Sequence, residues 1–215
     1  ARGIRGGFDF GGRPQPRLLR RRTTRVAYVV RVDLDDARPP IWRRVRLASD
    51  LTLDRVHDIL QVVMGWSNEH LHQFQMGPDT KDLRIRGFLT DFDLGEGEEG
   101  IPERDVRLDQ VLAKPGQRLF YWYDFGDSWH HTVKLEKVEP WRGGDPEAFC
   151  LTGRRACPPE DVGGMWGYAE LLDALDGELG DDPESMREKL EWLSPGYDPA
   201  DFDVHEVNRI LTTGA

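Results

Sequence analysis

Two histidines with the spacing of metal ligands, His70 and His72, lie in a segment that alternates like a β-strand. Side chains two positions apart on a strand project from the same face, about 7 Å apart at the backbone, so both imidazoles can bind one ion. Two further ligand types follow at Asp127, in a hairpin turn, and at His130, just beyond it. The pattern predicts a nitrogen and oxygen site for Zn²⁺ or Mn²⁺ formed by these four residues, with Asp124 and His131 as alternative ligands from the same hairpin.

The hairpin residues also offer acid–base chemistry. Asp124, Asp127 and His130 can act as general acid and base or bind Mg²⁺. A structural role is the alternative, because a turn aspartate accepts hydrogen bonds from nearby backbone amides. The histidines would then join aromatic residues such as Phe74 and Trp129 in the core. The sequence leaves both interpretations open.

Arginines cluster at the start of the chain, where residues 1–25 hold eight arginines and one acid. This segment has a net charge of +7, which leaves −17 for the rest of a chain whose total is −10. A basic arm attracts nucleic acid, whereas an acidic body repels it. The alternative is a solvated arm without a ligand. We expect DNA to contact five arginines: Arg17, Arg20, Arg21, Arg22 and Arg25.

Apolar periodicity predicts the elements that position these residues. We expect strands at 26–34, 41–47, 70–76 and 83–88, a hairpin of 119–123 and 129–138, and helices at 53–64, 168–175, 183–193 and 204–211. Residues 91–105 are acidic and rich in glycine, which indicates an exposed loop, and 140–164 are expected to be irregular. His57 lies on the apolar stripe of the 53–64 helix, where a hydrogen-bonded core-edge role is expected and catalysis is the alternative.

Strands first and helices last, without regular alternation, favour an α+β fold. We expect a mixed or antiparallel sheet packed by the 53–64 helix and a C-terminal helical segment. The domain organisation expected is a basic, Arg/Gly-rich arm at 1–24 and a single domain at 25–215.

Composition limits the environment of the chain. Two cysteines, Cys150 and Cys157, are too few for a disulfide scaffold, which favours a reducing, cytoplasmic compartment. The expected state of both is a buried, inert thiol, although the intervening arginines offer a way to activate one. No run approaches the roughly 20 apolar residues that span a bilayer, so we expect no membrane contact.

Several blocks of residues, in order, resemble the plasmid pRiA4b ORF-3-like family, which includes passenger proteins of insertion elements. The blocks are PPIWRR (39–44), His57 with MGW (64–66), HLHQF (70–74), YWYDFGDSWHH (121–131), CLTGRRACPPEDVGG (150–164), Tyr168, Phe202-Asp203 and Asn208. The resemblance implies an α+β fold and a mobile-element setting, but no reaction.

Two functional hypotheses follow from these observations. The leading one is an accessory or interaction protein of mobile genetic elements, with DNA or a protein as partner and the Arg-rich arm as the DNA contact. The alternative is a metal-dependent hydrolase or nuclease that uses His70 and His72 together with Asp124, Asp127 and His130. The two differ in whether these side chains converge in one cleft.

Overall fold

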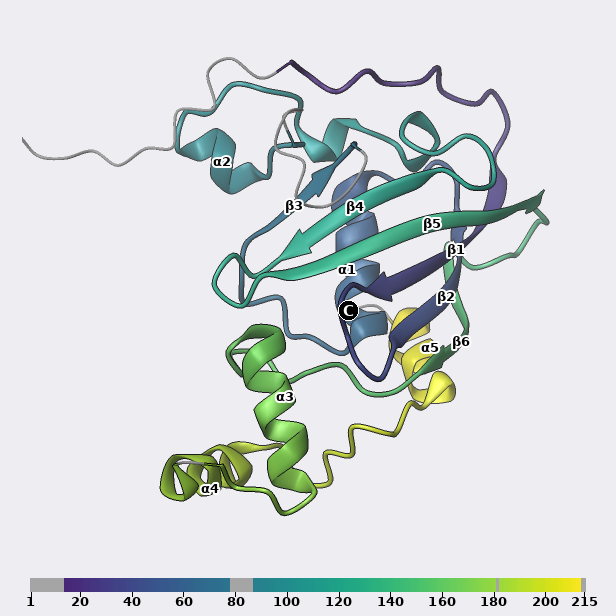
Figure 1. The fold of residues 1–215 in the computed structure, drawn as a ribbon. Helices are drawn as coiled ribbons and strands as arrows, with labels where there is room; N and C mark the ends of the chain where they lie inside the picture. The colour runs from purple at the N-terminus through teal and green to yellow at the C-terminus, as the bar shows by residue number, and fades with distance from the viewer. Residues whose placement is uncertain (1–13, 78–86, 181, 214–215) are drawn as a thin grey trace, which may run out of the picture.

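The protein is described by a computed structural model that covers residues 14–77, 87–180 and 182–213. Within these ranges one antiparallel sheet of six strands has the order β3-β4-β5-β1-β2-β6 (Figure 1). The strands are β1 (Val26–Leu34), β2 (Ile41–Ala48), β3 (His72–Gln75), β4 (Arg118–Tyr123), β5 (Trp129–Pro140) and β6 (Ala148–Arg154). The α+β class and the antiparallel sheet expected from the sequence are confirmed.

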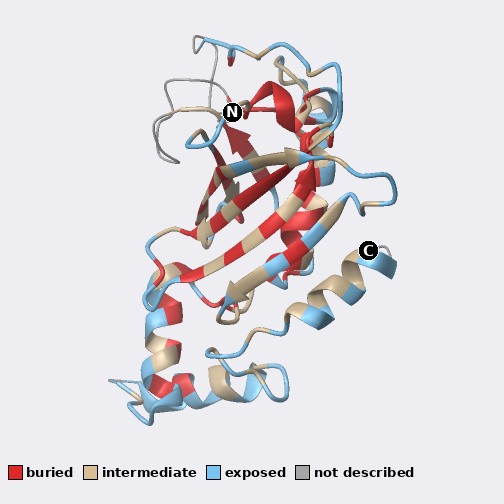
Figure 2. Ribbon diagram, turned by 90° about the vertical axis from the view of Figure 1, so that its right-hand side faces the viewer, coloured by how far each residue is buried: buried red, intermediate tan, exposed pale blue. Residues whose placement is uncertain are grey.

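One face of the sheet carries the core. Along β1, Tyr28, Val30, Val32 and Leu34 are fully buried or nearly so, and in the second half of the strand they alternate with the more accessible Arg31 and Asp33. Figure 2 shows the resulting alternation of buried and accessible residues along the strands. Burial of these side chains is the main favourable contribution to folding.

Helix α1 (Leu53–Met64) packs on this face. Its apolar stripe, which includes Val56, Leu60 and Val63, is buried in the same core as the strands. The helix ends at Gly65, whose φ of 93° is a left-handed conformation that glycine adopts without a steric penalty. The helix therefore has the bounds that the periodicity predicts, and it places His57 and Gln61 against the sheet.

Two segments differ from their predicted structure. Residues 140–164 contain the edge strand β6, which pairs with β2. Residues 91–105 contain helix α2 (Asp91–Gly95) and a 3₁₀ turn (Glu103–Asp105) whose Glu103 is buried. Both predictions were wrong: β6 and the buried Glu103 depend on contacts with distant parts of the chain, whereas α2 begins at a local capping box of Thr90 and Asp93. The strand expected at 83–88 lies mostly outside the described residues.

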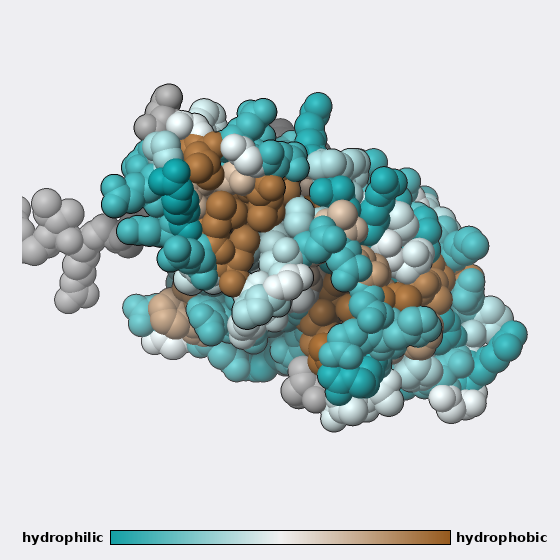
Figure 3. All heavy atoms as spheres, turned by 90° about the horizontal axis from the view of Figure 1, so that it is seen from below, coloured by the Kyte–Doolittle hydropathy of each residue, from teal (hydrophilic) through white to brown (hydrophobic). Residues whose placement is uncertain are grey.

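Three helices follow the sheet, at α3 (Gly164–Leu175), α4 (Pro183–Trp192) and α5 (Val204–Thr213). Helix α5 is tied to β6 because the side-chain amide of Asn208 donates to the Cys150 carbonyl and accepts from its amide. Helices α3 and α4 project below the sheet, and from that side apolar areas lie among hydrophilic side chains (Figure 3). None of the described helices is long and apolar enough to cross a membrane.

Candidate functional site

A cavity of about 310 Å³ opens between α1, the start of β3, α2 and the 3₁₀ turn. Its walls gather titratable residues from four separate stretches of the chain. The lining residues are Asp54, His57, Asn68, His70, Leu71, His72, Thr90, Asp91, Phe92, Glu103 and Arg104. Four of these are buried, namely the ionisable His57, His72 and Glu103 together with Thr90. A cavity with convergent buried ionisable groups is the best candidate for a functional site.

His57 belongs to a closed ring of hydrogen bonds. The Asn68 backbone amide donates to Gln61 Oε1 at 3.0 Å, so the Gln61 amide nitrogen donates to the Tyr121 hydroxyl at 2.9 Å. That hydroxyl is then the donor to His57 Nδ1 at 2.8 Å, and His57 Nε2–H donates to Asn68 Oδ1 at 2.7 Å. Both ring nitrogens of His57 are occupied, which makes it a positioning residue and not a free metal ligand.

The rings of His57 and His72 stack, with centroids 3.5 Å apart and planes within 5°. Burial, and after it the neighbouring His72, lower the pKa of His57 to about 4. Burial likewise lowers the pKa of His72 to about 4. Two stacked imidazoles in contact are therefore both neutral at pH 7, because a charge on either would lie in a poorly hydrated site beside the other.

Glu103 is the partner of His72 on the other side. Nε2 of His72 lies 3.1 and 3.0 Å from the two carboxyl oxygens, and the side chains are 10% and 8% exposed. Burial raises the pKa of Glu103 to about 8. At neutral pH the carboxyl group is protonated, and its O–H donates a hydrogen bond to Nε2 of the neutral imidazole. The cavity wall thus carries a carboxylic acid, a group that can release a proton.

The hairpin turn is held by its own aspartates. Asp124 Oδ1 accepts from the amides of Gly126 at 2.9 Å and Asp127 at 3.2 Å. Asp127 Oδ2 accepts from the Gly163 amide at 3.1 Å, which fastens the hairpin tip to the segment before α3. Of the three predicted acid–base candidates, both aspartates therefore have structural contacts, and Asp124 accepts these hydrogen bonds through one of its two oxygens.

His130 lies on the opposite side of the sheet from the cavity. It pairs with Trp122 across β4 and β5, and the two rings stack with centroids 5.2 Å apart. Its neighbours in register, His131 and Tyr121, point into the core. Because alternate residues of a strand face opposite ways, His130 cannot reach His72. The structure does not bring the four expected metal ligands, His70, His72, Asp127 and His130, into one site.

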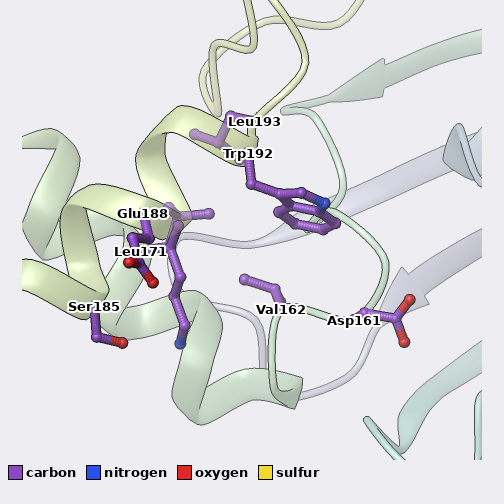
Figure 4. A pocket seen from close by; sticks show the side chains of 8 residues that line it. Asp161, Val162, Leu171, Ser185, Glu188, Trp192 and Leu193 are labelled. Atoms are coloured by element: carbon purple, nitrogen blue, oxygen red, sulfur yellow. The ribbon is translucent and has the colours of Figure 1, made fainter.

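His70 has different neighbours from His72. It precedes β3, and its Nε2 lies 3.7 Å from Asp124 Oδ2 and 3.4 Å from Asp161 Oδ1. Asp161 comes from the segment that Asp127 fastens. It also lines a second hollow of about 400 Å³ between α3 and α4 (Figure 4). Two of the expected candidates, His70 and Asp124, therefore meet each other and a third group.

The arginines expected to bind DNA are largely in contact with the domain. Arg21 donates to the Gln110 side chain and the Asp105 carbonyl, and Arg22 donates to the Tyr28 hydroxyl and the Ala113 carbonyl. Arg25 forms an ion pair with Asp50 at 2.8 Å. Arg17 and Arg20 are exposed. The end of the expected arm, from residue 14 onward, is described, and it lies against the segment around Gln110.

The two cysteine thiols are buried, and burial raises the pKa of each to about 11. Arg43, a buried guanidinium bonded to the carbonyls of Val63, Trp42 and Arg154, lowers both only in part. A thiol with a raised pKa is a poor nucleophile. This agrees with the inert state expected from the sequence.

Sequence reasoning missed Glu103 and the pairing of Asp161 with His70. Glu103 lies in a segment interpreted as an exposed loop, and nothing around it signals burial. Asp161 had one signal, the polar PPED run (158–161) within the blocks that carry the family resemblance. His57 was expected at the core edge, and its complete hydrogen bonding agrees with that expectation.

The protein has an α+β fold in which a buried acid–histidine pair lies beside a cavity. Comparison with known proteins identifies its family. The chain matches the plasmid pRiA4b ORF-3-like proteins over residues 26–206 and belongs to this family. It is 41% identical over 194 residues to the uncharacterized protein y4hQ of Sinorhizobium fredii, covering 86% of this chain and 92% of that protein.

A crystal structure of a protein of unknown function from Methanosarcina mazei Go1 has a similar fold. The TM-score is 0.70 at 31% identity, over 86% of this chain and 98% of the other. The family and the fold are therefore established together, and the function must be argued from the site.

Proposed function

We propose that the cavity beside His72 is a small-molecule site in which Glu103 transfers a proton, so that the protein is an acid–base enzyme. The observation that carries this proposal is the buried Glu103–His72 pair in the wall of an open cavity. A buried carboxylic acid that stays protonated at neutral pH is suited to general acid catalysis. His57 supports the pair by stacking on His72 while its own nitrogens are held.

The cavity walls indicate the substrate class. Two carboxylates, Asp54 and Asp91, lie in the wall with one cation, Arg104, which is paired with Asp91, and the protonated Glu103 adds no charge. This balance disfavours anions and suits a neutral or cationic molecule. The volume of about 310 Å³ lies at the lower end of the range for small-molecule sites. Phe92, which is largely exposed, offers an apolar surface at the rim.

The test is turnover by the wild type and by Glu103→Gln, which keeps a hydrogen bond to His72 but cannot release a proton. We would assay p-nitrophenyl acetate, a neutral ester, and benzoyl-arginine p-nitroanilide, a cationic amide. The wild type is expected to hydrolyse at least one of them, and Glu103→Gln to lose about 100-fold or more of that rate, as a missing general acid does.

Glu178→Gln is the matched control, because Glu178 is exposed beyond the end of α3. It should hydrolyse at the wild-type rate. Equal rates for wild type and Glu103→Gln, or no acceleration of either substrate by the wild type, would contradict the proposal.

A second candidate function is phosphate binding by residues 14–25, as in an accessory protein of mobile genetic elements that contacts DNA. Its support is the exposure of Arg17, Arg20 and Arg21 along one short segment. The internal bonds of Arg22 and Arg25 leave few cations, so we expect weak, salt-sensitive binding. Fluorescence anisotropy with duplex DNA at low salt would compare the wild type with Arg17→Ala/Arg20→Ala. Equal affinity of the two, or no binding, would reject this function.

A further inference from the structure

We propose that His70, Asp124 and Asp161 form a site for a divalent cation, Zn²⁺ or Mn²⁺, at the tip of the β4–β5 hairpin. One ligand atom from each residue lies within 4.8 Å of the other two. The site is separate from the Glu103–His72 pair and does not depend on the proposed acid–base function. It replaces the expected four-ligand arrangement with one imidazole and two carboxylates.

The spacing of the three atoms fits an ion better than it fits hydrogen bonds. Ligands about 2.1 Å from a tetrahedral Zn²⁺ are separated from one another by roughly 3.4 Å. His70 Nε2 lies 3.4 Å from Asp161 Oδ1 and 3.7 Å from Asp124 Oδ2. All three ligand atoms lie within 4.8 Å of one another, so small adjustments would bring them to the spacing of a tetrahedral site.

The central ligand atom, His70 Nε2, forms no hydrogen bond within the described part of the chain. It is also shielded from solvent. The Asp124 side chain is 8% exposed. Its Oδ1 accepts two backbone amides, whereas no described donor reaches Oδ2, which faces His70. A buried imidazole nitrogen without a partner is costly unless a ligand satisfies it.

The protein holds these groups in place through contacts that do not involve them. Asp127 binds the Gly163 amide, and a Cβ at Gly164 would lie 2.6 Å from the Asp127 carbonyl oxygen, so only glycine allows this approach. On the strand side, the Tyr123 hydroxyl donates to Glu160. The loop that carries Asp161 is therefore fixed to the hairpin that carries Asp124, as a preorganised site requires.

The aspartates are suited to their positions. Asp124 and Asp161 have φ values of 53° and 58°, in the left-handed region where Asp and Asn are the commonest non-glycine residues. Asp161 is 65% exposed, and Figure 4 shows its carboxylate directed away from α3 and α4. The ion would be reached from solvent on that side. Three protein ligands leave a tetrahedral ion one position for water.

The experiment measures metal binding directly. Protein dialysed against EDTA and then freed of it is titrated with ZnCl₂ and with MnCl₂ by isothermal calorimetry. We expect one ion per chain for at least one metal, together with a rise in melting temperature, because a ligand bound to the folded state stabilises it. His70→Ala and Asp161→Asn should each weaken binding at least about tenfold, since a ligand is lost.

Two controls make the result decisive. His205→Ala removes a histidine on α5, outside the cluster, and should bind metal as the wild type does. Asp161→Asn keeps the left-handed backbone and an exposed side chain, so it tests the site even if His70→Ala fails to fold. Glu103→Gln should also bind metal normally, which separates this proposal from the acid–base function. No binding by the wild type, or equal binding by Asp161→Asn, would overturn the proposal.

Discussion

His70 and His72 are separated by one residue, yet their surroundings are opposite. His72 is stacked on His57, hydrogen-bonded to Glu103 and almost completely buried. His70 is 24% exposed, and its Nε2 faces two carboxylates without a hydrogen bond from any described residue. Burial keeps His72 neutral at pH 7, with Glu103 as its acidic partner. His70 has the arrangement of carboxylate neighbours that a metal ligand requires.

The contrast separates two kinds of polar site. Both ring nitrogens of His57, and Nε2 of His72, have hydrogen-bond partners within the protein. Removing one of these groups therefore leaves its partner unpaired in the core. Around His70, by contrast, two carboxylates face an imidazole nitrogen that has no hydrogen-bond partner among the described residues. Substitution of the first kind of residue should cost stability, whereas substitution of the second should cost a ligand.

The largest effect is expected for Tyr121→Phe. This change leaves two buried groups without a partner, the Gln61 amide that donates to the hydroxyl and the His57 nitrogen that accepts from it. Each unpaired group costs about 1–3 kcal/mol, so the free energy of unfolding should fall by about 2–6 kcal/mol. Urea denaturation monitored by tryptophan fluorescence measures the change.

His70→Ala is the comparison for that measurement. In the absence of metal it should change the free energy of unfolding by less than about 0.5 kcal/mol, as a substitution outside a bonded network does. A loss as large as that of Tyr121→Phe would show that His70 is also a structural residue, and the contrast between the two sites would fail.

The second prediction concerns pH. The folded protein holds the Glu103 pKa at about 8, against a reference value of 4.5. The protonated form therefore stabilises the folded state at low pH, and that stability is lost as pH rises through the folded pKa. A full proton is worth about 1.4 kcal/mol per pH unit, which gives about 2 kcal/mol between pH 6.5 and 8.

Glu103→Gln removes this titration while keeping a donor for His72. Its unfolding free energy should change less between pH 6.5 and 8 than that of the wild type, with the two proteins closest at pH 6.5. Parallel pH profiles for the two proteins would show that Glu103 ionises normally, and the proposed proton donor would lose its physical basis.

Local patterns predicted much of the fold, and the reasons are physical. Helix α1 and the β4–β5 hairpin follow from apolar periodicity, a left-handed glycine and turn residues, all signals within a few residues. Strand β6 lacks such a signal, because it is an edge strand that exposes Phe149 and Leu151 and contains Gly153. Its only strand partner within the described residues is β2, about a hundred positions earlier.

The candidate sites were predictable only in their residue types. The histidines and hairpin aspartates stood out by spacing, but which of them meet depends on tertiary contacts. Glu103 is 31 positions from His72, and no local property of an acidic, glycine-containing segment indicates that one of its acids is buried. His130 lies on the opposite face of the sheet from His72 because its place in the β5 register is set by pairing with Trp122.

The smallest effect is expected at Asp127, which is neither part of the Glu103–His72 pair nor a proposed metal ligand. Its substitution should affect both the stability of the fold and the affinity for metal. Asp127→Ala removes the single hydrogen bond to the Gly163 amide, so the free energy of unfolding should fall by about 1 kcal/mol. The segment carrying Asp161 would be held less firmly against the hairpin, and Zn²⁺ affinity should fall by about threefold to tenfold, less than on loss of a ligand. Asp127→Asn keeps an acceptor oxygen and should restore most of both quantities. Calorimetry with ZnCl₂ and urea denaturation of the two variants measure them. If Asp127→Ala binds zinc as the wild type does, Asp161 is held by other contacts, such as that between Glu160 and Tyr123, and the preorganisation assigned to Asp127 is wrong.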